Sequence, residues 1–264
     1  MLPNQQPPPG WPTPARTVRG AVSAGFMVLI SAFLALTTVL AAASGDIRYA
    51  LGFGVVAVLV GLLAAVTITR LRRPRPASGP PAAGVNDQGE AGIAFPYSRL
   101  RSNLITAVFV VLTVGCAGFA VAVAVEHTVA GWVSAAAGAV LTVLFGWLTT
   151  IMVRLMPGVI VLTPSGIYHR SQMLEYFVPW DAVVQVVARG GSRPALTVKA
   201  MPSRNARERR YTGGTGEAKA LPFLVANAYL LGANAVPAYN AVTHYLQTPV
   251  ERHQLAAVAA SSGH

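Results

Sequence analysis

Four long stretches without a charged residue are the feature that most limits what this chain can fold into. They cover residues 20–43, 50–69, 103–125 and 129–153, and none of them contains Asp, Glu, Lys, Arg or His. Each has about the 20 residues that a helix needs to cross the hydrocarbon core of a bilayer. Only 11% of the 264 residues are charged, against about 25% in an average soluble domain. The sequence therefore predicts a multi-pass membrane α-helical protein with four transmembrane helices in two hairpins.

Arginines mark one end of every predicted helix. They are Arg16 and Arg19 before the first, Arg70, Arg72, Arg73 and Arg75 after the second, Arg99 and Arg101 before the third, and Arg154 after the fourth. Because cytoplasmic loops carry an excess of Arg and Lys, we expect both termini to lie in the cytoplasm and the protein to reside in a cell membrane. A cleaved signal peptide is an alternative for the first stretch, although this stretch exceeds the roughly 7 to 15 apolar residues of such signals.

The remaining segments suggest a division of the chain outside the hairpins. Residues 1–15 carry six prolines and predict a disordered Pro-rich tail. Transmembrane hairpin 1 is expected over 16–73, a flexible cytoplasmic linker over 74–96, and transmembrane hairpin 2 over 97–156. A small α+β cytoplasmic domain with C-terminal helices follows over 157–256, and 257–264 is expected to be a flexible tail.

Short alternating apolar runs predict a meander of five strands in the last third of the chain. These runs lie near 159–163, 167–170, 174–178, 182–187 and 196–200. The polar stretch 202–219 is expected to be a mobile loop. Two helices are expected near 221–231 and 236–247, the second ending before Pro249.

The segments LTPSGIYHR (162–170) and FVPWDAV (177–183) form a pattern, L-T-P-x-G followed by P-W-D, which resembles that of bacterial PH-like domains beside transmembrane hairpins. The ending HYLQTPVERHQLA resembles the Y-L-x-x-P-x-x-R-x-x-L segment that accompanies such domains. The matching residues of the first pattern are Leu162, Thr163, Pro164, Gly166, Pro179, Trp180 and Asp181. The resemblance implies a partly open β-barrel or sheet capped by a helix, in proteins that usually lack catalytic activity.

Three residues of this region are tempting as site residues, but we expect structural roles for them. Trp180 is large enough to anchor a small core. Asp181 is expected to accept backbone N–H bonds or to pair with an arginine. His169 is expected on a strand surface rather than in a metal site.

The sequence offers no spacing typical of a catalytic or metal site, so we expect no catalytic residue, no cofactor and no metal. Its basic loops suggest contact with anionic lipid headgroups or with an unknown protein partner, through Arg189, Arg193, Arg204, Arg207, Arg209 and Arg210. A nucleic-acid partner is not expected, because the high arginine content also follows from GC-rich coding. We expect a non-enzymatic membrane-anchored binding or scaffold protein that uses its cytoplasmic PH-like domain. The alternative is a transport or permeability component formed by the four spans, including in an oligomer.

Overall fold

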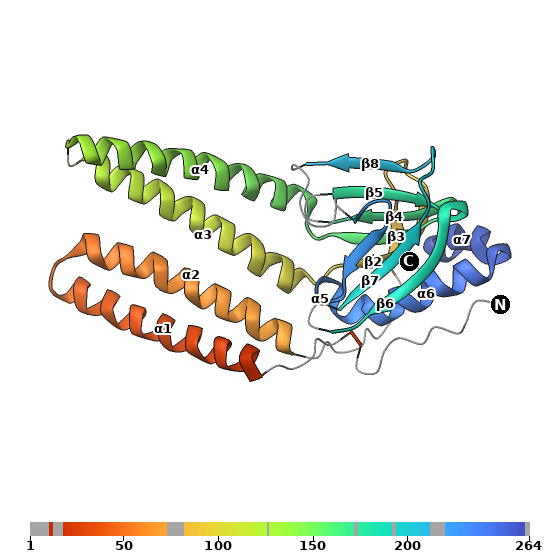
Figure 1. The fold of residues 1–264 in the computed structure, drawn as a ribbon, viewed down its shortest axis with the longest axis horizontal. Helices are drawn as coiled ribbons and strands as arrows, with labels where there is room; N and C mark the ends of the chain where they lie inside the picture. Colours follow the sequence, from red (N-terminus) through yellow and green to blue (C-terminus); the bar gives the residue numbers. More distant parts are fainter. Residues whose placement is uncertain are drawn as a thin grey trace. The chain divides into compact units, whose positions relative to one another are not determined.

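The computed structural model describes residues 11–12, 18–72, 82–125, 127–171, 174–191, 194–211 and 220–261. The chain forms two compact units (Figure 1). We call residues 16–71 and 100–154 the helical unit, and residues 1–15, 72–99 and 155–264 the β domain.

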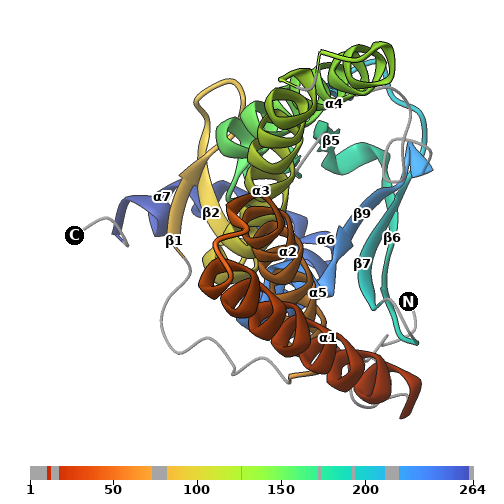
Figure 2. The same cartoon turned by 90° about the vertical axis from the view of Figure 1, so that its left-hand side faces the viewer.

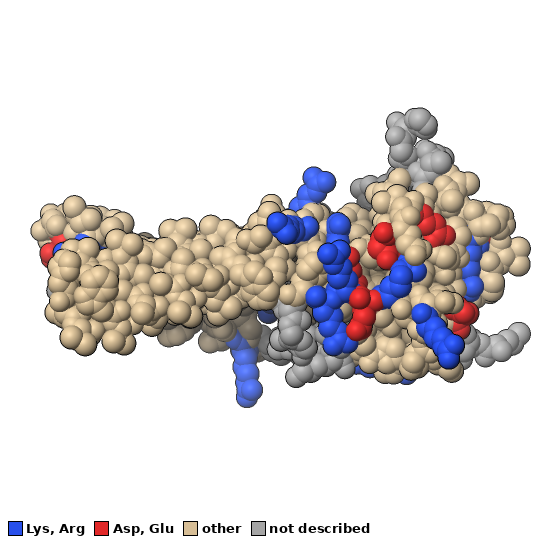
Figure 3. All heavy atoms as spheres, turned by 90° about the horizontal axis from the view of Figure 1, so that it is seen from above, with Lys and Arg blue, Asp and Glu red and all other residues tan. Residues whose placement is uncertain are grey.

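The helical unit consists of four long helices. They are α1 (Val18–Ala43), α2 (Ile47–Leu71), α3 (Arg99–Ala124) and α4 (Val129–Leu155). All four are long and apolar enough to cross a membrane, and their visible surface is almost free of charged side chains (Figure 3). The predicted hairpins are thus confirmed, and the chain is a multi-pass membrane protein.

Small residues bring the helices of each hairpin together. A Cβ atom added at Gly138 of α4 would lie 3.0 Å from Ala120 Cβ of α3, and one at Gly61 of α2 would lie 3.1 Å from Ser31 Oγ of α1. The Ser31 hydroxyl also donates a hydrogen bond to the Ala57 carbonyl oxygen at 2.9 Å. Close approach at small residues and hydrogen bonds between helices are the usual means of association in lipid.

Two antiparallel sheets form the β domain. The larger contains, in spatial order, β1 (Ala82–Val85), β2 (Ala91–Pro96), β3 (Val159–Leu162), β4 (Gly166–Arg170), β5 (Leu174–Pro179) and β8 (Arg207–Arg210). The smaller contains β6 (Val183–Arg189), β7 (Ala195–Ala200) and β9 (Leu224–Asn227), which lie side by side in Figure 2. The 3-10 turn η1 (Trp180–Ala182) connects β5 to β6.

A set of short and medium helices completes the β domain after β9. They are α5 (Ala228–Leu231), η3 (Gly232–Asn234), α6 (Ala235–Gln247), η4 (Pro249–His253) and α7 (Gln254–Ser261). Helix α6 buries Ala235, Ala238, Tyr239 and Val242, a spacing that places one apolar face toward the core. Leu162, Leu196 and Leu255 are fully buried, so both sheets and the C-terminal helices contribute to the core.

The second helical hairpin interrupts a pair of hydrogen-bonded strands. Strands β2 and β3 are antiparallel neighbours with Pro96 opposite Val159. Helix α3 begins three positions after Pro96 and α4 ends four positions before Val159. The ladder continues into these connections, because the Tyr97 N–H donates to the Gly158 carbonyl oxygen at 2.8 Å. The β domain is therefore assembled from sequence on both sides of α3 and α4.

Several predictions made outside the helices need correction. Residues 82–96, predicted to be flexible linker, form β1 and β2, because the edge of β3 offers backbone partners to β2, and β2 in turn pairs with β1. The stretch 224–227, predicted to be helical, is β9, and only 228–231 is helix. Part of the predicted mobile loop forms β8, and α7 extends to Ser261 in the predicted C-terminal tail. The five predicted strands correspond to β3 through β7.

The predicted Pro-rich tail is described only at Trp11 and Pro12. Trp11 is buried, its indole Nε1–H donates to the Arg189 carbonyl oxygen at 3.1 Å, and its ring lies 5.6 Å from that of Tyr239. The prediction of disorder is therefore wrong at this residue, since a large aromatic side chain gains more by burial than the tail loses by ordering locally.

Candidate ligand cleft

The two sequence patterns that carry the resemblance, L-T-P-x-G and P-W-D, are in direct contact in the structure. The Trp180 backbone N–H donates to the Ser165 carbonyl oxygen at 3.3 Å, and its indole Nε1–H donates to the Thr163 carbonyl oxygen at 2.8 Å. Gly166 leaves no room for a side chain, since an added Cβ would lie 2.6 Å from Phe177 Cζ. Trp180 is buried, so its expected structural role is confirmed.

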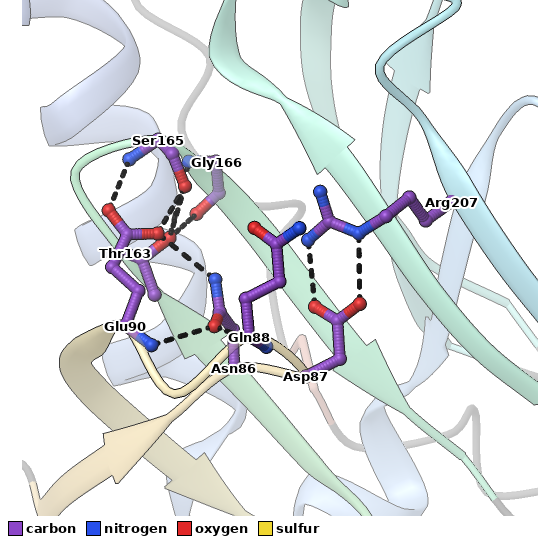
Figure 4. A network of polar contacts seen from close by, with 8 residues as sticks. All are labelled: Asn86, Asp87, Gln88, Glu90, Thr163, Ser165, Gly166 and Arg207. Atoms are coloured by element: carbon purple, nitrogen blue, oxygen red, sulfur yellow. Dashed lines mark hydrogen bonds and ion pairs between the residues drawn. The ribbon is translucent and has the colours of Figure 1, made fainter.

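The turn between β1 and β2 is hydrogen-bonded to the Thr163–Gly166 turn (Figure 4). The Asn86 side-chain oxygen accepts backbone N–H bonds from Gln88 and Glu90, both at 2.9 Å. The Glu90 carboxylate accepts bonds from the Ser165 backbone N–H, at 3.1 Å, and from the Ser165 hydroxyl. This turn was predicted to be part of a flexible linker. It instead fixes the Thr163–Gly166 turn and places Gln88 beside it.

An ion pair joins the same turn to the edge strand β8. Arg207 donates to Asp87 through Nε at 2.9 Å and through Nη2 at 2.8 Å, a two-pronged arrangement drawn in Figure 4. The hydrogen bonds from Arg207 lower the pKa of the Asp87 carboxyl below its ordinary value. The Arg207 guanidinium also lies over the Phe177 ring, 4.0 Å from its centroid. Both charged groups are partly exposed, so the pair contributes little to stability.

A second arginine lies on the buried tryptophan. The Arg252 guanidinium lies 4.8 Å from the Trp180 ring centroid, and it donates to the Tyr245 and Leu246 carbonyl oxygens at 2.7 Å and 3.3 Å. These carbonyls belong to the last turn of α6, where helical partners are missing. Desolvation lowers the Arg252 pKa. Among the described residues, Arg252 makes no ion pair.

These elements surround an open cleft of about 630 Å³. Its walls come from the β1–β2 turn, the Thr163–Gly166 turn, the end of β5, η1, the segment before β8, and η4. The lining residues are Gln88, Ser165, Phe177, Pro179, Trp180, Asp181, Arg204, Asn205, Arg207 and Arg252. Asp181 and Arg204 are exposed and make no hydrogen bond or ion pair within the described part of the chain. The expected backbone or arginine partner of Asp181 is thus not found there, because its side chain faces solvent.

Two of the six predicted contact arginines, Arg204 and Arg207, lie in the cleft. Arg210 pairs with Glu208 on β8 at 2.9 Å, and the Arg209 guanidinium lies 5.2 Å from the Tyr211 ring centroid. Arg189 is at the end of β6, where its carbonyl accepts the Trp11 bond. Arg193 lies outside the described residues.

Arg252 was not among the contact residues predicted from the sequence. The signal was present in the pattern Y-L-x-x-P-x-x-R, whose Tyr, Leu and Arg are Tyr245, Leu246 and Arg252. The structure gives that spacing a reason, because the arginine binds the carbonyls of the other two. Gln88 and Asp87 carried no such signal.

His169 has a different place from the one expected. It is fully buried on β4, and its Nε2 forms a hydrogen bond with the Tyr97 hydroxyl at 2.6 Å. Burial lowers its pKa to about 4, so the ring is neutral at physiological pH. The strand-surface prediction is wrong because the side chain at this position points into the core.

The described residues contain no group of three or more His, Cys, Asp or Glu side chains placed to hold a metal ion. The cleft instead presents guanidinium groups, a carboxylate and amide groups beside aromatic rings, which suits it to bind a polar ligand. No protein-family model matches the sequence, and neither the curated proteins nor the solved structures contain a significant match.

Proposed function

We propose that this chain is a membrane-anchored, non-enzymatic binding or scaffold protein, whose β domain is a PH-like domain on the cytoplasmic side of the membrane. The observation that carries the proposal is the insertion of α3 and α4 between the paired strands β2 and β3. Connections of two and three residues join the β domain to these spans, so a ligand bound by the β domain is bound by a membrane-anchored chain.

The PH-like assignment has support from the order of elements. Antiparallel strands form two sheets, and α6 follows the last strand with one face in the core. The Thr163–Gly166 turn and Trp180 are hydrogen-bonded to each other, so the two motifs that carry the resemblance form one structural unit. The cytoplasmic orientation is supported by the arginines at the corresponding ends of all four helices.

The proposal is tested by capturing partners through crosslinking in cells. The full chain is compared with a chain in which residues 82–96 are replaced by a Gly/Ser linker and residues 156–264 are removed. Both parts must change, because the β1–β2 pair would otherwise stay behind without its partner strand β3. We expect the partners of the full chain to be lost from the shortened one. Retention of every partner would contradict a binding role for the β domain and would favour a function of the spans.

A further inference from the structure

Two guanidinium groups in the cleft lack a carboxylate partner among the described residues. One is Arg204, which is exposed and makes no contact of this kind. The other is Arg252, which donates hydrogen bonds to two backbone carbonyls. Because a guanidinium has about five N–H donors, roughly three on Arg252 remain for a ligand.

Arg252 is held ready for a ligand before one arrives. Its two carbonyl bonds and the Trp180 ring beneath it fix the orientation of the guanidinium plane. A planar guanidinium group whose orientation is already fixed loses little side-chain entropy on binding, and its paired N–H groups match the geometry of a carboxylate. Phe177 and Pro179 also line the cleft, but both are buried, and the Arg207 guanidinium lies over the Phe177 ring.

The charge balance of the cleft favours a single carboxylate over an anionic membrane surface. Arg207 and Arg210 are already paired with Asp87 and Glu208. Asp181 adds an exposed negative charge to the cleft wall. Several anionic headgroups packed around this wall would each be repelled by Asp181, whereas a single carboxylate meets two guanidinium groups, Arg252 and Arg204, against this one negative charge.

We propose that the cleft binds a peptide segment of a partner protein through one acidic side chain, with Arg252 and Arg204 as its ligands. This inference rests on the proposed function of the β domain as a binding module.

The test uses the full chain in nanodiscs of neutral lipid and two pools of fluorescein-labelled pentapeptides. The pools have random outer positions and differ only in a central Glu or Gln. Binding is measured by fluorescence polarisation. We expect the Glu pool to bind about tenfold tighter than the Gln pool, since a hydrogen-bonded charge contributes on this scale. Equal binding of the two pools, or binding of neither, would overturn the proposal.

Point variants assign the effect to the cleft. Arg204→Gln is expected to weaken the Glu pool about fivefold or more, and it leaves the fold intact because Arg204 has no partner among the described residues. Asp181→Asn is expected to tighten the Glu pool about two- to threefold, since it removes a nearby like charge. Arg209→Gln, outside the cleft lining, is the matched control and should change nothing. An Arg204→Gln variant that binds the Glu pool like the unaltered chain contradicts the proposal.

Arg252 requires a gentler change because its bonds also hold the end of α6. Arg252→Lys keeps the charge and loses the planar guanidinium group, so we expect weaker Glu binding with an unchanged unfolding temperature. If unfolding also shifts, Arg204→Gln and Asp181→Asn still decide the question.

Two further arms separate the competing explanations. The first arm uses nanodiscs that contain anionic lipid. If Arg204→Gln weakens contact with the headgroups but leaves peptide binding unchanged, the ligand of the cleft is a lipid headgroup and the peptide proposal is wrong. In cells, partner capture that persists with Arg204→Gln and Arg252→Lys together would overturn the cleft proposal and leave the binding function of the β domain standing.

Discussion

The two helical hairpins resemble each other in length and apolar composition, but they are attached to the β domain in different ways. Their helices have 26 and 25 residues in the first hairpin, and 26 and 27 in the second. The second hairpin leaves from one pair of hydrogen-bonded strands, with two residues between β2 and α3 and three between α4 and β3. In the first, ten residues separate α2 from β1.

The difference shows that hydropathy identifies a membrane span but does not reveal whether the span is inserted between two paired strands. Hairpin two stands where a β-hairpin would have its turn. Its two helices are therefore joined directly to the paired strands β2 and β3. A change at this junction should disturb the β domain more than an equivalent change in hairpin one. The predictions below test that contrast.

The largest effect is expected at the junction of α4 and β3. An added Cβ at Gly158 would lie 2.6 Å from the Arg170 carbonyl oxygen and 2.7 Å from Tyr97 Cδ2, whereas Gly52 in α2 has nothing within 4 Å. We expect Gly158→Val to destabilise the β domain by about 4 kcal/mol, and Gly52→Val to change it by less than about 1 kcal/mol. Chemical unfolding in detergent, followed by tryptophan fluorescence, measures both. Similar losses in the two variants would contradict the contrast.

A pH effect is expected at the same junction through His169, which is bonded to Tyr97. The unfolded chain binds a proton near pH 6.5, but the folded chain does so only near pH 4. The free energy of unfolding therefore falls as the pH drops through this window, by about 3 kcal/mol for this group.

The His169→Gln variant provides the control for this pH dependence. Its free energy of unfolding should depend less on pH between about 6.5 and 4, whatever its stability at neutral pH. The measurement is a series of urea unfolding curves across this range. An identical slope for both chains would show that His169 is protonated equally in the folded and unfolded states.

The smallest effect is expected at Trp11, one of the two described residues that precede hairpin one. Its contacts with Tyr239 and the Arg189 carbonyl are local. Trp11→Ala should lower the stability of the β domain by only about 1 kcal/mol while making the N-terminal segment cut faster by protease. Unchanged cleavage would show that the tail is not held at this residue.

The spans and the strands β3 to β7 could be predicted because their signals are local. An uncharged stretch of sufficient length predicts a span, and alternating residues such as Leu174 and Tyr176 predict a strand with one buried face. The two motifs around Thr163 and Trp180 are hydrogen-bonded to each other within the β domain.

The missed strands depend on partners that are distant in the sequence. β8 has the sequence Arg-Glu-Arg-Arg and forms because its backbone pairs with that of β5. Pro96 of β2 pairs with Val159 of β3, and 62 residues of sequence lie between them. No local pattern encodes such pairing, since strand formation follows context more than intrinsic preference. One part of the cleft was missed for the same reason, because Gln88 lines it from the turn before β2 and Asp87 of the same turn pairs with the lining residue Arg207.

The central claim is that β1 and β2 belong to the same folded domain as residues 157–261, across the inserted hairpin. It is tested most directly with two soluble chains. One is residues 157–261 alone, and the other joins residues 82–97 to 158–261 through Asn-Gly, a pair suited to a two-residue hairpin turn because Tyr97 lies opposite Gly158. Thermal unfolding is followed by circular dichroism. The account predicts cooperative unfolding of the joined chain only, and equally cooperative unfolding of residues 157–261 alone would contradict it.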